Sequence, residues 1–120
     1  MKCPKCTNIK LRTIIENNIE VDFCESCGGV WFDRNEFEKM TDKVVELSFE
    51  RAVHEITPFD TDRMTANCPV CHIVMEKIPK NNVANLTIDQ CMRCKGIWLD
   101  RGEFYRLSKE KLLHKIKYSL

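Results

Sequence analysis

All eight cysteines of this 120-residue chain fall in four Cys-x-x-Cys pairs, and the pairs belong to two copies of one longer pattern. Each copy has a Cys-Pro-x-Cys pair, a loop of strand-forming residues and a second Cys-x-x-Cys pair. The second copy carries a two-residue insertion between its pairs. Each copy is too small to bury an ample apolar core alone, so the repeat predicts two small units that need additional stabilisation.

The spacing of the cysteines predicts metal binding. Two residues between paired cysteines allow a tight turn to direct both sulfurs at one ion, and a tetrahedral set of thiolates suits zinc. Four protein sulfurs leave no open position for a substrate, so we expect two structural Zn²⁺ ions. Iron and iron–sulfur clusters also accept four thiolates, and iron is therefore an alternative metal.

Two other uses of paired cysteines fit the sequence less well. Cys-Pro-x-Cys resembles a thioredoxin-type redox pair, but such a pair opens a helix, whereas strand-forming residues follow here. The run from Cys68 to His72 fits the attachment motif of c-type haem, but the equivalent of His72 in the first copy is Thr7. His54 and His114 do not align with one another, and we interpret both as surface or packing residues.

The segments between the cysteine pairs predict a β-hairpin in each copy. Residues 11–15 and 19–23 are rich in β-branched side chains, and apolar residues alternate with charged ones in the second segment. In the second copy the expected strands are residues 73–78 and 86–90, and residues 79–85 form a longer turn that absorbs the insertion.

A helix is expected behind each hairpin, because apolar residues then recur at helical spacing. The predicted fold is a small metal-stabilised α+β protein of tandem zinc ribbons, each a β-hairpin with four-cysteine zinc knuckles followed by an α-helix. Repeat 1 is assigned to residues 1–56, a linker to residues 57–67 and repeat 2 to residues 68–120. Pro58 lies in this linker and would end a helix that arrives from the N-terminal side.

Glycine and tryptophan follow the second cysteine pair of each copy. Gly28, Gly29 and Gly96 are expected to let the chain leave the metal turn with positive φ. Trp31 and Trp98 could stack a base, but their apolar neighbours favour a place in the core.

Carboxylates at the same place in both copies predict helix starts. The spacing of a capping box occurs in both, at Asp33 and Glu36 and at Asp100 and Glu103. In such a box each side chain accepts a hydrogen bond from the backbone amide of the other residue. The later helical segments, residues 45–56 and 112–120, carry a second apolar stripe that predicts packing on the other repeat or on a second subunit.

The segment after each second pair is the most specific part of the sequence. It reads Gly-Gly-Val-Trp-Phe-Asp-Arg-Asn-Glu in the first copy and Lys-Gly-Ile-Trp-Leu-Asp-Arg-Gly-Glu in the second. With the cysteine pairs, these runs resemble the transcription factor IIB-type zinc-finger family of small prokaryotic zinc-ribbon proteins, over residues 3–40 and 68–107. Phe32, Asn35 and Lys95 depart from the family pattern and affect only local turn geometry. The resemblance implies that one zinc ion is bound by Cys3, Cys6, Cys24 and Cys27 and the other by Cys68, Cys71, Cys91 and Cys94.

Charge and hydrophobicity indicate which partners and which location to expect for the protein. The net charge is +1, but acidic residues outnumber basic ones in residues 1–62 and the reverse holds in residues 63–120. No run approaches the roughly 20 apolar residues that span a bilayer, so no membrane contact is expected. The N-terminus has no apolar stretch typical of a secretory signal, which favours a cytoplasmic location.

No catalytic constellation, organic cofactor site or small-molecule substrate site is evident, so the sequence predicts that the protein is not an enzyme. The expected function is that of a zinc-binding tandem zinc-ribbon protein acting as a nucleic-acid-binding or transcription-associated module. The alternative is a protein–protein interaction adaptor or self-associating scaffold with purely structural zinc. Its partner, or a second copy of the chain in a homo-oligomer, would then pack on the helices.

Overall fold

Short strands dominate the structure, a computed structural model that describes residues 1–16, 19–39, 64–80, 83 and 85–109. In chain order the elements are β1 (Arg12–Glu16), β2 (Ile19–Phe23), β3 (Val30–Phe32), α1 (Arg34–Lys39), β4 (Glu76–Pro79), β5 (Thr87–Gln90), β6 (Ile97–Leu99) and α4 (Arg101–Lys109). None of the helices in the described ranges has the length and apolar character needed to cross a bilayer.

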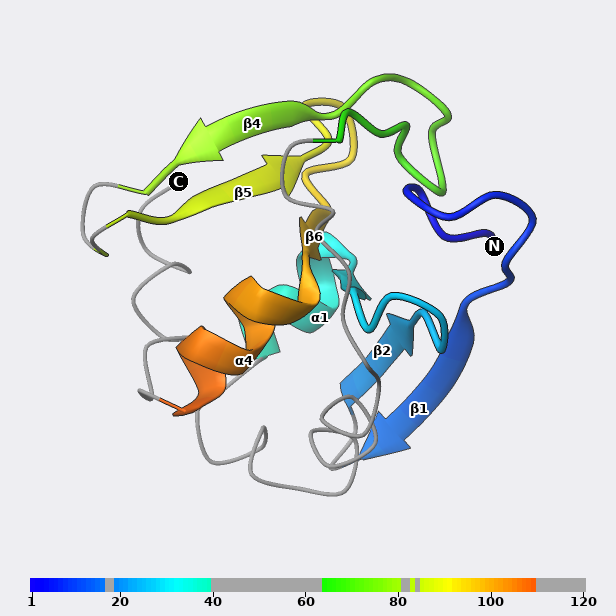
Figure 1. Cartoon of the computed structure of the whole chain (residues 1–120), viewed down its shortest axis with the longest axis horizontal. Helices are drawn as coiled ribbons and strands as arrows, with labels where there is room; N and C mark the ends of the chain where they lie inside the picture. The colour runs from blue at the N-terminus through cyan, green and yellow to red at the C-terminus, as the bar shows by residue number, and fades with distance from the viewer. Residues whose placement is uncertain (17–18, 40–63, 81–82, 84, 110–120) are drawn as a thin grey trace.

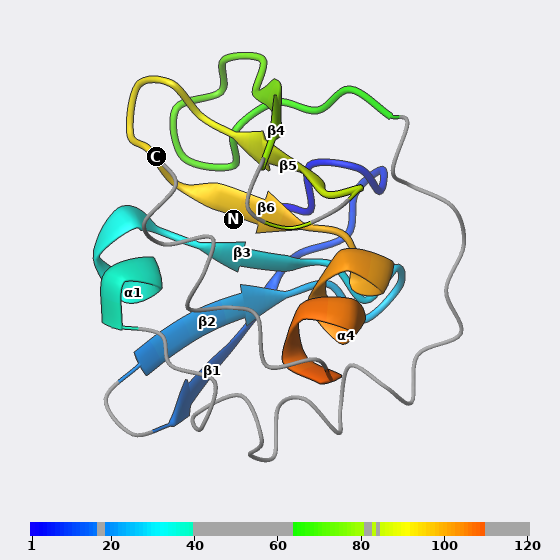
Figure 2. The same cartoon turned by 90° about the vertical axis from the view of Figure 1, so that its left-hand side faces the viewer.

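The six strands form one antiparallel sheet in the order β1-β2-β3-β6-β5-β4, to which each repeat contributes three strands. The hairpins β1–β2 and β4–β5 lie at the two edges of this sheet (Figure 1). At the centre, β3 pairs with β6, and Trp31 is the register partner of Trp98. Figure 2 shows these two strands side by side between the hairpins. The repeats therefore meet through equivalent strands, with the tryptophan pair at the midpoint.

The hairpins lie close to the segments that the sequence predicts, although β4 begins three residues later than expected. The third strand of each repeat, β3 and β6, was not predicted. As a result, α1 and α4 follow a third strand and do not follow the hairpins directly. Three-residue strands carry too little periodicity to be recognised alone, and these two find their central partner in the other repeat.

The proposed linker and domain boundaries stay a prediction, since residues 57–63 lie outside the described ranges. The described end of the linker pairs with repeat 2. The amide of Met75 donates to the carbonyl of Ala66 at 2.9 Å, and Asn67 forms a bridge with Val74. The expected packing of residues 45–56 and 112–120 also lies outside the described residues.

Alternation along the strands gives the sheet two different buried faces. One face carries an aliphatic and aromatic core to which α4 contributes Phe104 and Leu107, and the rings of Phe32 and Phe104 lie 6.3 Å apart. The other face carries Trp31 and Trp98 together with cysteines of both repeats. The cysteine clusters thus adjoin a single shared core, which the two repeats build together.

Candidate metal centres

Four tight turns position the cysteines, and a backbone hydrogen bond closes each turn. The amides of Cys3 and Cys68 donate to the carbonyls of Ile9 and Ile73, both at 2.7 Å. The residue before each isoleucine has positive φ, 59° at Asn8 and 61° at His72. The structural equivalent of His72 is therefore Asn8 rather than Thr7, because the first turn is one residue longer. The second turns close by hydrogen bonds from Cys24 to Gly29 at 2.9 Å and from Cys91 to Gly96 at 3.0 Å.

These turns bring the sulfurs into two groups of four, in which all ligand atoms lie within 4.8 Å of one another. Site 1 comprises Cys3, Cys6, Cys24 and Cys27, and site 2 comprises Cys68, Cys71, Cys91 and Cys94. The sulfur–sulfur distances are 3.9 Å for Cys3–Cys27, 3.8 Å for Cys6–Cys24 and 3.7 Å for Cys68–Cys94. A tetrahedron with zinc–sulfur bonds of about 2.3 Å has edges of about 3.8 Å. Both groups could therefore each hold a metal ion of this kind.

Backbone amides point at the sulfurs and favour their thiolate form. The amide of Lys5 lies 3.4 Å from the sulfur of Cys3, and that of Cys71 lies 3.2 Å from the sulfur of Cys68. The amide of Cys27 lies 3.4 Å from the sulfur of Cys24. Hydrogen bonds to a charged acceptor are stronger than those to a neutral one, so these turns are suited to hold metal-bound thiolates.

Crowding of the sulfurs separates their pKa values. Hydrogen bonds with Cys27 and Cys3 lower the pKa of Cys24 to about 2. The hydrogen bond between Cys3 and Cys24 in turn raises the pKa of Cys3 to about 12. In site 2 burial opposes ionisation of Cys91. Backbone hydrogen bonds, of which that from the amide of Cys94 has the largest effect, nevertheless lower the pKa of Cys91 to about 7. Four adjacent thiolates repel one another, and a divalent cation removes this repulsion while the remaining protons leave.

Comparison with known proteins agrees with this geometry. A family model described as transcription factor zinc-finger matches residues 2–43 and 67–110. The chain belongs to the transcription factor zinc-finger family. The two matched segments are two tandem copies of the family's zinc ribbon. No curated protein and no solved structure matches the sequence.

The tryptophans of this zinc-finger protein pack across the repeat boundary. Trp31 and Trp98 are 1% and 0% exposed, so both are core residues and neither offers a face for base stacking. A methyl group placed on Gly29 would overlap the ring of Trp98, and one placed on Gly96 would overlap the ring of Trp31. The expectation of positive φ is confirmed only for Gly28, at 77°; Gly29 and Gly96 instead provide room for the tryptophans.

A buried ion pair that the sequence did not predict also joins the two zinc-finger copies. The ammonium of Lys5, in the first turn of site 1, lies 2.8 Å from a carboxylate oxygen of Asp89 and 2.8 Å from one of Asp100. Burial opposes the charge of Lys5, but hydrogen bonds to Asp100 and Asp89 outweigh it and raise the pKa of the lysine. In the second copy Val70 takes the place of Lys5, and no local sequence pattern indicates this distant contact.

The predicted capping boxes differ between the copies. In the first, the carboxylate of Asp33 accepts a hydrogen bond from the amide of Glu36 at 2.9 Å, as expected. In the second, the amide of Asp100 donates to the carboxylate of Glu103 at 3.0 Å. The carboxylate of Asp100 contacts Lys5 and also accepts a hydrogen bond from the indole of Trp98 at 3.1 Å. Both carboxylate pairs therefore have structural roles.

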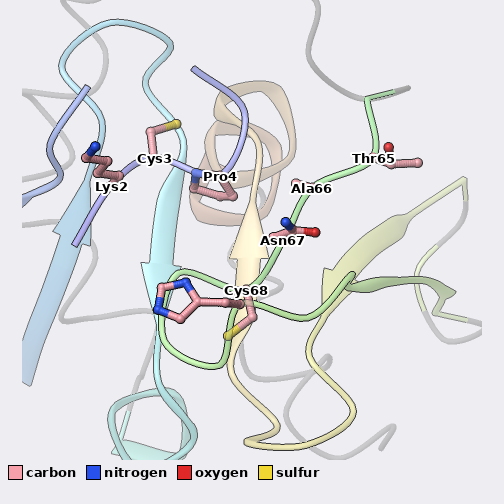
Figure 3. A pocket seen from close by; sticks show the side chains of 8 residues that line it. Lys2, Cys3, Pro4, Thr65, Ala66, Asn67 and Cys68 are labelled. Atoms are coloured by element: carbon pink, nitrogen blue, oxygen red, sulfur yellow. The ribbon is translucent and has the colours of Figure 1, made fainter. Parts of the chain in front are cut away.

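A hollow of about 370 Å³ opens between the two repeats, and its lining includes Lys2, Cys3, Pro4, Asn67, Cys68 and His72. Figure 3 shows Cys3 and Pro4 on one side and the segment from Thr65 to Cys68 on the other. Because Cys3 belongs to site 1 and Cys68 to site 2, the two sites flank the same hollow. His72 carries the only imidazole in the described ranges, and it is exposed.

Proposed function

We propose that this zinc-binding module holds two structural zinc ions, one in site 1 and one in site 2. The observation that carries this proposal is the sulfur spacing of 3.7–3.9 Å, which matches the edge of a zinc tetrathiolate tetrahedron. Five of the eight cysteines are buried, which is typical of a site that stabilises a fold. Zinc would connect chain segments that have little apolar surface of their own.

Metal analysis of the purified protein tests this first proposal. We expect two zinc ions per chain by native mass spectrometry, and loss of sheet structure in circular dichroism when a chelator removes them. Cys24→Ser should reduce the content to one ion or fewer, whereas the exposed Met92→Ser in the second turn of site 2 should leave two. Two iron ions, or no bound metal, would contradict the assignment to zinc.

A catalytic role is not part of the proposal. Catalytic zinc generally keeps one coordination position for water, whereas each group here supplies four sulfurs. We propose instead that the protein acts by binding, as a nucleic-acid-binding or transcription-associated module. The support for this role is the family to which the chain belongs and the excess of basic residues in residues 63–120. Such binding would rest on phosphate contacts, because both tryptophans are buried.

Fluorescence anisotropy with mixed random DNA and RNA tests this binding role. The zinc-loaded protein should bind at low salt, and affinity should fall steeply with added salt because counterions are released. Arg93→Gln, at an exposed position in the second turn of site 2, should weaken binding, and Glu25→Gln, at an exposed position in the second turn of site 1, should not. Absence of binding at low salt would refute the nucleic-acid role while leaving the zinc proposal intact.

A protein–protein adaptor is the second candidate, and exposed apolar residues at site 2 favour it. Val70 and Met92 lie in its two cysteine turns and are 51% and 42% exposed. The residues at the same positions of site 1 are Lys5 and Glu25. Added salt does not screen apolar contacts as it screens charges, so a complex or homo-oligomer of this kind should persist at high salt in light scattering after gel filtration. A monomer that retains nucleic acid only at low salt would contradict it.

A further inference from the structure

We propose that the two metal sites are energetically coupled, so that loading one site strengthens metal binding at the other, and that Lys5 is the main coupling residue. This inference rests on the proposed zinc binding, and it goes beyond that proposal because tandem zinc ribbons could equally bind their ions independently. Its basis is the set of buried contacts in which the metal-binding turns of one repeat form part of the core of the other.

The first step is the place of Lys5. It lies between the ligands Cys3 and Cys6, so the turn that metal binding fixes at site 1 also fixes the direction of its side chain. The side chain is 0% exposed, and its ammonium ends between two carboxylates of the other repeat, Asp89 and Asp100, whose side chains are 3% and 2% exposed. An ammonium in this position cannot return to water without opening the boundary between the repeats.

The second step is what site 2 would lose without that ammonium. Oxygens of Asp89 and Asp100 both lie 2.8 Å from the same nitrogen, so without Lys5 two buried carboxylates would face one another across a short gap. Lys77, at 2.9 Å from Asp89, would remain beside that carboxylate. Asp89 lies in β5 and Asp100 directly follows β6, and the turn that carries Cys91 and Cys94 connects these two strands. Repulsion between the carboxylates would therefore strain the chain on both sides of the site 2 ligands.

The third step is the return path from repeat 2 to site 1. Trp98 of β6 covers Gly29, and the carbonyl of Gly29 closes the turn that begins at Cys24, at 2.9 Å. Loss of order in repeat 2 would uncover this turn. Trp31 covers Gly96 in the same way, and the carbonyl of Gly96 closes the second turn of site 2. Coupling between binding sites is reciprocal by thermodynamic linkage, so either ion should favour the other.

Only the first repeat supplies a buried lysine at this turn position, and this provides a matched control. Val70 occupies in site 2 the position that Lys5 occupies in site 1, but it is 51% exposed. Substitution of Val70 therefore changes the same position of an equivalent turn without touching the shared core. If coupling arose simply from having two ribbons in one chain, changes at the two positions would have equal effects.

Titration of the full-length apoprotein with Co²⁺ against a competing chelator tests the proposal, because the absorption of cobalt thiolates reports how much metal the cysteines hold, and a variant with one disabled site reports the other site alone. With site 1 disabled by Cys24→Ser and Cys27→Ser, the affinity of site 2 should fall roughly 5–150-fold. Lys5→Met, which keeps all eight cysteines, should weaken loading of both sites and reduce the cooperativity of the titration, whereas Val70→Met should change neither.

Three further results complete the test. If Lys5→Met only prevented folding, adding Asp89→Asn and Asp100→Asn should restore folding by removing the buried charges, and the restored protein should load its sites less cooperatively. Unchanged affinity of site 2 after loss of site 1, or equal effects of the Lys5 and Val70 substitutions, would overturn the coupling while leaving zinc binding in place. If the unmodified protein bound no metal at either site, the proposed function itself would fail.

Discussion

Trp98 in the second repeat lies directly over Gly29 in the first, at a distance that leaves no room for a β-carbon. Trp31 lies over Gly96 in the reciprocal arrangement. The glycine and tryptophan that recur after each second cysteine pair therefore form a contact between the repeats, with each copy supplying the glycine for the other's indole. This explains why a motif next to the metal site is repeated although its side chains bind no metal.

We expect Gly29→Ala and Gly96→Ala each to lower the free energy of unfolding of the metal-loaded protein by about 1–3 kcal/mol, the usual cost of overpacking a core. Urea unfolding followed by circular dichroism would measure this. Gly102→Ala is the matched control, because Gly102 lies in α4 with no atom within 4 Å of an added β-carbon. That variant should be unchanged or more stable by up to about 1 kcal/mol, given the low helix propensity of glycine. Equal losses at all three positions would contradict the role of the tryptophan contacts.

The sequence predicted the local parts of the fold well. Pairing of Cys3 with Cys6 and of Cys91 with Cys94 depends on turns only a few residues long, so spacing alone indicates which sulfurs share a turn. Alternation in residues 19–23 likewise identified β2. The contact of Lys5 with Asp89 and the pairing of β3 with β6 join residues far apart in the chain, and nothing in the local pattern of either partner encodes the other. Lys5 in particular occupies a turn position where an exposed side chain is the ordinary expectation.

Gly28 and its counterpart Lys95 have the same backbone conformation, with φ of 77° and 65°, but only the first is a glycine. Side chains other than glycine are strained in this region by about 1–2 kcal/mol. We expect Gly28→Ala to destabilise the protein by about that amount. Lys95→Gly should stabilise it by less, because glycine also increases the entropy of the unfolded chain. Thermal unfolding of the two metal-loaded variants checks this, and a stability loss in Lys95→Gly would show that the lysine side chain makes a compensating contact.

Lys80 is a buried lysine whose ammonium has no hydrogen-bond partner among the described residues, and its residue is 3% exposed. Burial lowers the pKa of Lys80 below its ordinary value of 10.5. The folded protein thus binds this proton more weakly than the unfolded chain does, so the penalty is largest at neutral pH and shrinks as pH rises toward 10.5. We expect Lys80→Met to raise the free energy of unfolding at pH 7 by about 1–3 kcal/mol, the desolvation cost of an unsatisfied group.

Urea unfolding of the Lys80→Met variant and the unmodified protein at pH 7 and pH 9 would test this expectation. The gain from Lys80→Met should be smaller at the higher pH. The exposed Lys10 offers a control, and Lys10→Met should change stability by less than about 0.5 kcal/mol at either pH. A loss of stability in Lys80→Met would mean that the buried ammonium is satisfied by a partner outside the described residues.

Asp33 and Asp100 occupy the same place in the repeated motif, yet their removal should have different costs. Asp33 is exposed and accepts one hydrogen bond at the start of α1, so Asp33→Ala should cost about 0.5–2 kcal/mol, as for other helix caps. Asp100 is 1% exposed and contacts Lys5 and Trp98. Asp100→Ala removes one partner of a buried ion pair, which typically costs 3–5 kcal/mol. Asp89 would still pair with Lys5 and Lys77, so Lys5 would keep one buried partner. We therefore expect a loss near the lower value.

The same pair of variants separates a helix cap from a contact between repeats. Asp33→Asn keeps a capping oxygen and should recover most of the stability lost in Asp33→Ala. Asp100→Asn keeps the shape but removes the charge that balances Lys5, so it should recover little. Indole hydrogen exchange at Trp98 gives a second measurement, because its N–H donates to Asp100 at 3.1 Å and should exchange faster in Asp100→Ala, which removes the acceptor oxygen. Equal recovery by asparagine at the two positions would show that Asp100 acts as an ordinary cap, and that its charge contributes nothing to the boundary between the repeats.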